Sequence, residues 1–189
     1  MKTTRILYAI QGTGNGHVTR AMEIVPELQK HATVDVLISG SQWELMLPFP
    51  VKYRMHGMGF VFGKKGGVDL LKTYLQLDTR NLLREINSLP VEAYDLVISD
   101  FEPVSSWACV LKNKPCIALS NQVATLHPNA PRPEHTDLIG KLILEHYAPS
   151  TAGYGFHFSR YDDQIYTPII RRQVRDTVVE NNEHVTVYL

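Results

Sequence analysis

Short apolar runs recur along the chain, and most of them end at a glycine, a serine or an aspartate. They are too short for typical helices and are rich in β-branched residues, which favours buried strands. The strands expected on this basis cover residues 5–10, 33–39, 51–55, 95–100, 115–120 and 152–159.

Between these runs, apolar residues return every three or four positions, which is the period of one helix face. The clearest helix face consists of Val18, Ala21, Met22, Val25 and Leu28. A proline inside this helix, Pro26, is expected to kink it or to cost about 3 kcal/mol. The other helices are expected at 41–47, 69–89, 104–112 and 136–147, with a loop at 127–135.

Strands and helices therefore alternate through most of the chain. Such alternation at this spacing produces βαβ units with a parallel sheet and right-handed crossovers. The run at 95–100 is almost continuously apolar, as expected for a strand covered on both faces. The predicted fold class is α/β, with a Rossmann-like, doubly wound and mainly parallel sheet.

The last part of the chain departs from this alternation. Residues 167–182 have mixed character, and "EHVTVYL" (183–189) has the pattern of a strand with no helix after it. We expect an N-terminal domain over 1–165, and a segment over 166–189 that ends in the first strand of a second domain. The alternative is that 183–189 forms an edge strand of the first domain. An unpaired apolar strand would also favour pairing between copies of the chain, as in a homo-oligomer.

Composition limits the functions that fit. Of 189 residues, 44% are hydrophobic, 20% are charged, and the formal net charge is zero. This balance gives no support for nucleic-acid binding through bulk charge. The only two cysteines, Cys109 and Cys116, lack metal-ligand spacing and fit buried, reduced thiols in a cytoplasmic protein. No apolar segment approaches the length of a membrane span.

The first expected strand is followed by "IQGTGNGHVTRA" (10–21), in which Gly12, Gly14 and Gly16 alternate. A strand, a glycine-rich turn and a helix start together favour the binding of a phosphate or another anion. The dinucleotide fingerprint has a different glycine spacing and needs an acid after the second strand, where this chain has Ser39, Gly40 and Ser41. A Walker loop is excluded because its Gly-Lys-Ser/Thr is absent.

The histidine after the last glycine, His17, is the most specific feature of this loop. At the first turn of a helix it is expected to project into the crevice above the sheet. The helix dipole disfavours the imidazolium there, so a neutral ring could act as a general base or as a hydrogen-bond donor to a substrate oxygen. The alternative is a helix-capping role without chemistry. Asn15 is either a second donor to the same oxygen or a turn residue that tolerates positive φ.

Two segments carry a resemblance to a known family. "GTGNGHVTRAMEI" resembles the N-terminal loop of GT-B glycosyltransferases, in the branch with lipid II N-acetylglucosaminyltransferases and plant galactolipid synthases. "YDLVISDFEPVSSWACVLKNKPCIALSNQ" (94–122) resembles a second segment of the same family, and "TPIIRRQV…HVTVYL" resembles its passage into the second domain.

The resemblance implies a transferase that moves a sugar, of the hexosyl type, from a nucleotide-sugar donor to a glycan, lipid or small-molecule acceptor. It implies an N-terminal acceptor domain and a C-terminal donor domain with the reaction between them, no bound metal and no cofactor. The chain has the pattern of the acceptor half and the first strand of the donor half, so we expect it to be inactive alone. The implied site is cytoplasmic, with peripheral contact to the membrane.

Polar residues at two further strand ends complete the candidate site. Asp100 and Glu102 follow the strand at 95–100, and Ser120, Asn121 and Gln122 end the strand at 115–120. In a doubly wound sheet these ends line the ligand crevice. Asp100 either polarises His17 or orients acceptor hydroxyls, or else it caps the next helix. The amides suit sugar hydroxyls, although 120–122 also fits a plain polar turn.

The segment "HGMGFVFGKKGG" (56–67) combines aromatic residues with two lysines. It is either a membrane-contacting tip or an excursion whose aromatics pack in the core. The other histidines show no metal-ligand spacing. A different functional class also stays open, a non-catalytic Rossmann-like module that holds an anionic small molecule. An NAD-linked epimerase or reductase is disfavoured because the acid for the ribose is missing.

Overall fold

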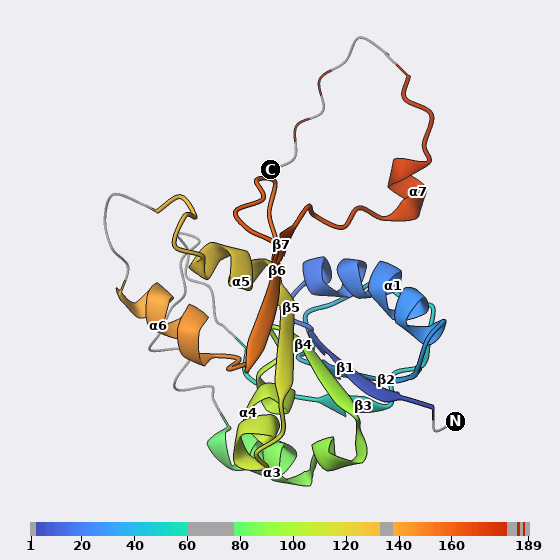
Figure 1. Ribbon diagram of the computed structural model, residues 1–189. Helices are drawn as coiled ribbons and strands as arrows, with labels where there is room; N and C mark the ends of the chain where they lie inside the picture. The colour runs from blue at the N-terminus through green and yellow to red at the C-terminus, as the bar shows by residue number, and fades with distance from the viewer. Residues whose placement is uncertain (1–2, 60–77, 133–137, 181–184, 186, 188–189) are drawn as a thin grey trace.

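The computed structural model describes residues 3–59, 78–132, 138–180, 185 and 187. Strands and helices alternate along the chain (Figure 1). In chain order they are β1 (Arg5–Gln11), α1 (Asn15–Gln29), β2 (Thr33–Ser39), β3 (Tyr53–Met55), α3 (Thr79–Ser88), the 3-10 helix η1 (Val91–Ala93), β4 (Leu96–Asp100), α4 (Pro103–Leu111), β5 (Cys116–Ser120), α5 (Asn121–Leu126), α6 (Leu138–His146), β6 (Ala152–Phe156), β7 (Ile165–Tyr166) and α7 (Arg172–Arg175).

The strands of the described residues form one seven-stranded sheet in the order β3-β2-β1-β4-β5-β6-β7. Every neighbouring pair runs parallel. From β1 the chain adds strands first on one side, at β2 and β3, and then on the other, from β4 onward. Ligand sites in such sheets lie at this change of direction, beyond the carboxyl ends of the strands. The predicted Rossmann-like α/β fold is confirmed.

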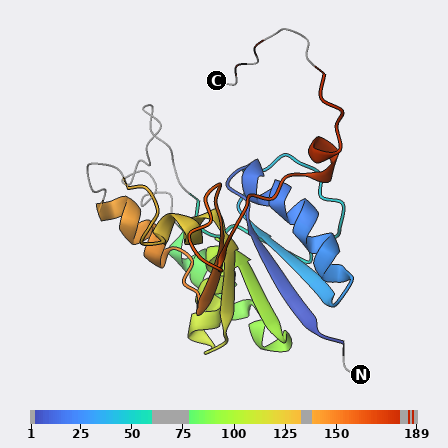
Figure 2. The same cartoon turned by 45° about the horizontal axis from the view of Figure 1, so that its top comes forward.

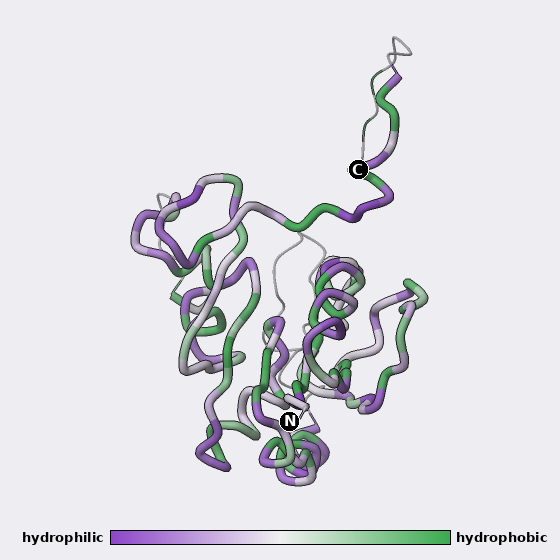
Figure 3. Tube along the Cα trace, turned by 45° about the vertical axis from the view of Figure 1, so that its right-hand side comes forward, coloured by the Kyte–Doolittle hydropathy of each residue, from purple (hydrophilic) through white to green (hydrophobic). Residues whose placement is uncertain are grey.

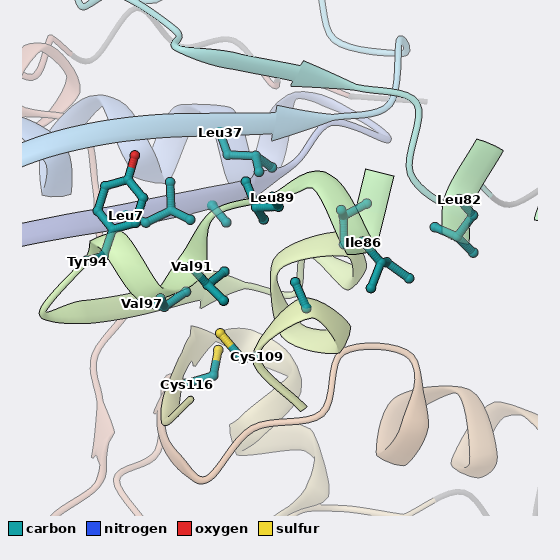
Figure 4. Packing of buried hydrophobic residues seen from close by; sticks show 13 residues of the cluster. Leu7, Leu37, Leu82, Ile86, Leu89, Val91, Tyr94, Val97, Cys109 and Cys116 are labelled. Atoms are coloured by element: carbon teal, nitrogen blue, oxygen red, sulfur yellow. The ribbon is translucent and has the colours of Figure 1, made fainter. Parts of the chain in front are cut away.

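Successive side chains of the central strand β1 point to opposite faces of the sheet. Both faces are buried. Leu7 and Ala9 belong to the cluster that packs against α3 and α4 (Figure 4). Tyr8 and Ile10 belong to the cluster on the other face, which is covered by α1. The sheet is therefore enclosed by helices where the strands carry continuous apolar runs.

The helix that follows the glycine loop is longer than its apolar face suggested. It begins at Asn15 and continues past Pro26 to Gln29. Its buried face includes Val18, Ala21 and Val25, as the periodicity predicts. Pro26 removes one backbone donor but does not end the helix.

The prediction of a helix at 41–47 is wrong. This segment has no regular secondary structure, and its side chains alternate between half-buried and exposed positions. The inward residues pack on the α1 side of the sheet at every second position, namely Trp43, Leu45, Leu47, Phe49 and Val51. A period of two belongs to extended chain, and the prolines at 48 and 50 are compatible with extended backbone but not with a helix interior.

Some predictions fall on residues outside the described part of the chain. The helix expected at 69–89 is present as α3 from Thr79 to Ser88, while 69–77 lie outside the description. Most of the aromatic and lysine segment at 56–67 also lies outside it, as does most of the strand expected at 183–189. Of the described helices, none combines the length and the apolar character that crossing a membrane requires.

After β7 the chain crosses to α1 (Figure 2). There the backbone N–H of Arg172 donates to Oε1 of Glu23 across 3.0 Å. The domain boundary expected after residue 165 falls inside β7, which still belongs to the sheet. Beyond α7 the chain carries hydrophobic stretches (Figure 3). Val178 and Val179 in this part of the chain are exposed.

Candidate active site

Three strand ends bring most of the expected site residues to one edge of the sheet. The glycine loop follows β1, Asp100 ends β4, and Asn121 follows β5. Because β1, β4 and β5 are parallel neighbours, their carboxyl ends lie at the same edge. The order of the strands therefore assembles side chains that are about a hundred positions apart in the sequence.

The three glycines of the loop lie in different surroundings. The N–H of Gly12 donates to the carbonyl of Ser39 at 2.6 Å, and a Cβ on Gly12 would lie 2.7 Å from that oxygen. Gly12 therefore allows the loop to pack against the chain after β2. A Cβ on Gly14 or Gly16 would meet no atom within 4 Å. These two glycines face open space.

The amino end of α1 is open as well. Gly14 occupies the N-cap position, and no side chain caps the helix. The side chain of Asn15 is turned away from this role, because its Oδ1 accepts a hydrogen bond from the N–H of Glu44 at 3.1 Å. An uncapped helix start presents backbone N–H groups and the positive end of the helix dipole to the crevice.

His17 and Asp100 are in direct contact. Nδ1 of His17 lies 2.8 Å from Oδ1 of Asp100, and the Asp100 side chain is fully buried. An ionised carboxylate can only accept, so we assign the hydrogen to Nδ1 of His17. This tautomer leaves the lone pair on Nε2, the nitrogen that does not contact Asp100. The pair has the geometry of an imidazole base oriented by a carboxylate.

Arg20 was not expected in the site, yet it lies at its centre. Its Nε and Nη2 donate to the two oxygens of Asp100 at 2.8 and 2.7 Å. Its Nη1 donates to Oδ1 of Asn121 at 2.8 Å, and its Nη2 lies 3.0 Å from Nδ1 of His17. The available signal was its position three residues after His17, which places both residues on one helix face.

The guanidinium of Arg20 is almost completely buried. Burial opposes its charge, but the hydrogen bonds and the charge of Asp100 outweigh burial and raise the pKa of Arg20 above its usual value. The Arg20 guanidinium also lies over the ring of Phe156, 5.3 Å from the ring centre. Four strand ends therefore meet around one buried cation.

The structure places Glu102 away from the crevice. Its side chain is fully buried, and its carboxylate accepts from the N–H groups of Val104 and Ser105 at 2.8 and 2.6 Å. Glu102 is thus the N-cap of α4, the role that was considered for Asp100. Burial raises the pKa of this carboxyl group. A substrate-binding role for Glu102 does not fit this position.

Phe101 lies beside His17 and also lines a neighbouring cavity. Its backbone has a φ of 56°, which is rare for a residue with a side chain. The Phe101 ring lies parallel to that of His17, with centres 6.5 Å apart, and also contacts Tyr147. Beside it is a cavity of about 190 Å³, lined in part by Ser120 and Gln122.

A second cavity of about 370 Å³ borders the glycine loop at Thr13. Its polar lining residues are Thr13, Ser41, Gln42, His56, Asp78 and Asn81. Hydroxyl and amide groups both donate and accept hydrogen bonds, which suits ligands with many hydroxyl groups. Among the residues that the structure describes, no cluster of three or more His, Cys, Asp or Glu side chains is arranged to hold a metal ion.

Comparison with known proteins connects this site to a family. The crystal structure of Acinetobacter baumannii MurG is similar, with 13% sequence identity and a TM-score of 0.49, over 94% of this chain and 50% of that one. The chain thus spans about half the length of that protein. No curated protein sequence matches the chain. A family model for glycosyl transferase family 1 matches residues 4–189, which include the glycine loop, His17, Asp100 and Asn121. The resemblance seen in the sequence is therefore confirmed at the level of the family, and the chain belongs to glycosyl transferase family 1.

Proposed function

We propose that this chain forms the acceptor-binding part of a glycosyltransferase that uses a nucleotide-sugar donor. The observation that carries this proposal is the 2.8 Å contact between His17 and Asp100 at the open carboxyl edge of the sheet. Membership of glycosyl transferase family 1 supports the reaction class. The sugar is of the hexose type, and the acceptor is a glycan, a lipid or a small molecule with a free hydroxyl.

In the proposed reaction, Nε2 of His17 accepts the proton of the acceptor hydroxyl. The acceptor oxygen then forms a bond to the anomeric carbon of the sugar, and the bond from that carbon to the diphosphate breaks. Asp100 holds the Nδ1 hydrogen and stabilises the imidazolium that forms. General-base help of this kind contributes about 10²- to 10⁴-fold in rate.

The open amino end of α1 suits the leaving group. The developing negative charge of a nucleoside diphosphate is favoured near uncapped N–H groups and the positive helix end. Gly14 and Gly16 leave room for its close approach. The donor nucleotide itself is assigned to a second domain, so transfer requires more than residues 1–189. The reaction takes place at the cytoplasmic side, with peripheral membrane contact where the acceptor is a lipid.

The decisive experiment is a donor screen on the full-length protein. Nucleotide sugars are offered with glycan, lipid and small-molecule acceptors, and released nucleoside diphosphate and glycosylated product are measured. We expect His17→Ala to keep the fold, judged by circular dichroism, and to lower kcat by about 10²- to 10⁴-fold. Full activity in this variant would refute the general-base role.

A second candidate function rests on the same open helix end. A non-catalytic module would hold an anionic small molecule on the glycine loop without chemistry. In that case calorimetry with the full-length protein would detect binding of a nucleoside diphosphate. No donor would then yield product, and His17→Ala would change affinity alone.

A further inference from the structure

The two buried charges next to His17 balance each other. The carboxylate of Asp100 and the guanidinium of Arg20 form a two-pronged pair that carries no net charge. Oδ1 of Asp100, Nη2 of Arg20 and Nδ1 of His17 lie within 3.0 Å of one another. His17 therefore contacts an anion and a cation at the same time, whereas a simple histidine–carboxylate pair would contact the anion alone.

This arrangement changes the cost of protonating His17. With Arg20 present, a proton on Nε2 gives the cluster a net positive charge beside the positive end of α1. Without Arg20, the same proton would neutralise the buried carboxylate. Opposite charges within a few ångströms favour the charged form of a group, and like charges disfavour it. Arg20 thus opposes the imidazolium that Asp100 alone would favour.

The remaining groups around His17 do not alter this balance. The described residues that face the cluster from other elements include Asn121 of α5, Tyr8 of β1, Phe156 of β6 and the ring of Phe101. Asn121, Phe156 and Phe101 carry no charge. The hydroxyl of Tyr8 stays protonated, since burial raises its pKa well above the usual value.

We propose that Arg20 is a positioning residue that fixes Asp100 through two hydrogen bonds and opposes protonation of His17 through the positive charge that it places beside Nδ1. Its importance for turnover rests on the proposed function, but its effect on the charge of His17 does not. Arg20 also connects the pair to Asn121, so that the base and the end of β5 keep one relative position.

A cycle of charge changes tests the proposal in the 189-residue chain itself. The titration of His17 is followed by NMR of its imidazole ring, with His17→Gln used to assign the signal. We expect Arg20→Met to move the midpoint of this titration upward by about one pH unit or more, and Asp100→Asn to move it downward. The double variant should return toward the wild-type midpoint.

The double variant and Arg20→Lys keep the test decisive. Arg20→Met leaves the buried Asp100 without its guanidinium partner, and such a loss is strongly destabilising. If this variant does not fold, Asp100→Asn is compared with the double variant, and the double variant should have the higher midpoint. Arg20→Lys retains the charge but not the planar fork, so its midpoint should stay near that of the wild type.

Equal midpoints in Asp100→Asn and the double variant would overturn the inference. So would shifts of Arg20→Met and Asp100→Asn in the same direction. In the active full-length enzyme, the acid limb of the kcat/KM profile should move with the midpoint. If no sugar is transferred but the midpoint still moves as expected, the proposed function fails and the role of Arg20 stands.

Discussion

The backbone of Gly12 lies against that of Ser39, with 2.6 Å between the nitrogen of the first and the carbonyl oxygen of the second. Gly12→Ala would place a methyl group 2.7 Å from that oxygen and 2.8 Å from the ring of Trp43. We expect this variant to lose about 1–3 kcal/mol in free energy of unfolding, as overpacked sites do. Urea denaturation followed by circular dichroism measures the loss.

Gly16→Ala is the matched control for this prediction. Gly16 lies in the first turn of α1, and its added methyl group would meet nothing within 4 Å. Replacing glycine by alanine in a helix is neutral or stabilises by up to about 1 kcal/mol. Equal losses in the two variants would contradict the close approach at Gly12.

Asp35 gives a pH-dependent contribution to stability. Burial raises its pKa, but hydrogen bonds from Lys52 and Tyr94 outweigh burial and hold the pKa below its usual range. A lowered folded-state value stabilises the protein above the unfolded pKa of about 3.9, and this contribution is lost as the pH falls through the folded value. Asp35→Asn should cost about 1–3 kcal/mol at pH 7 and progressively less below pH 4.

Urea unfolding of Asp35→Asn and wild type at neutral and acid pH measures this difference. The control is Asp163→Asn, since the side chain of Asp163 is fully exposed. It should leave stability almost unchanged at both values. A gap between Asp35→Asn and wild type that widens in acid would have the wrong sign for this explanation.

Tyr8 and Tyr94 offer opposite tests of buried hydroxyl groups. The hydroxyl of Tyr8 is buried, and no hydrogen-bond partner for it is present among the described residues. The hydroxyl of Tyr94 contacts Asp35 at 2.8 Å and Tyr53 at 3.1 Å. Tyr8→Phe should therefore be neutral or stabilising, and Tyr94→Phe should cost about 0.5–1.5 kcal/mol. Thermal unfolding of both variants decides this, and a marked loss in Tyr8→Phe alone would reverse the ranking.

Glu102 should behave as a structural residue. Its two hydrogen bonds to the start of α4 are buried, whereas Asp78 caps α3 at the surface with one bond of 2.9 Å. We expect Asp78→Ala to cost about 1 kcal/mol and Glu102→Ala about 2 kcal/mol or more. Chemical denaturation compares the two. A smaller loss at Glu102 than at Asp78 would argue against the capping role.

The alternation of strands and helices was predictable because each buried strand is an apolar run of its own. Runs such as 95–100 and 115–120 begin and end within a residue or two of β4 and β5. The segment 41–47 misled because Trp43 and Leu47 are spaced like one helix face. The same residues also fit a period of two, and the prolines that follow favour that reading.

The site was predictable only in part. The sequence placed His17, Asp100 and Asn121 at strand ends, and the parallel sheet brings these ends together. It did not reveal Arg20, because an arginine on a mostly apolar helix face has the same pattern whether it reaches solvent or a buried acid. Nor could the sequence distinguish Asp100 from Glu102 as the helix cap, a choice that depends on the turn at Phe101.

The pairing of Arg20 with Asp100 has an evolutionary consequence. Loss of either residue would leave the other charge buried without a counter-charge. A single substitution at one position is therefore selected against until the second position changes as well. We therefore expect Arg20 and Asp100 to be retained or replaced together among descendants of a common ancestor. His17 is partly exposed, so a substitution there leaves no buried charge unpaired. We expect His17 to vary, without a compensating change elsewhere, wherever the chemistry has been lost.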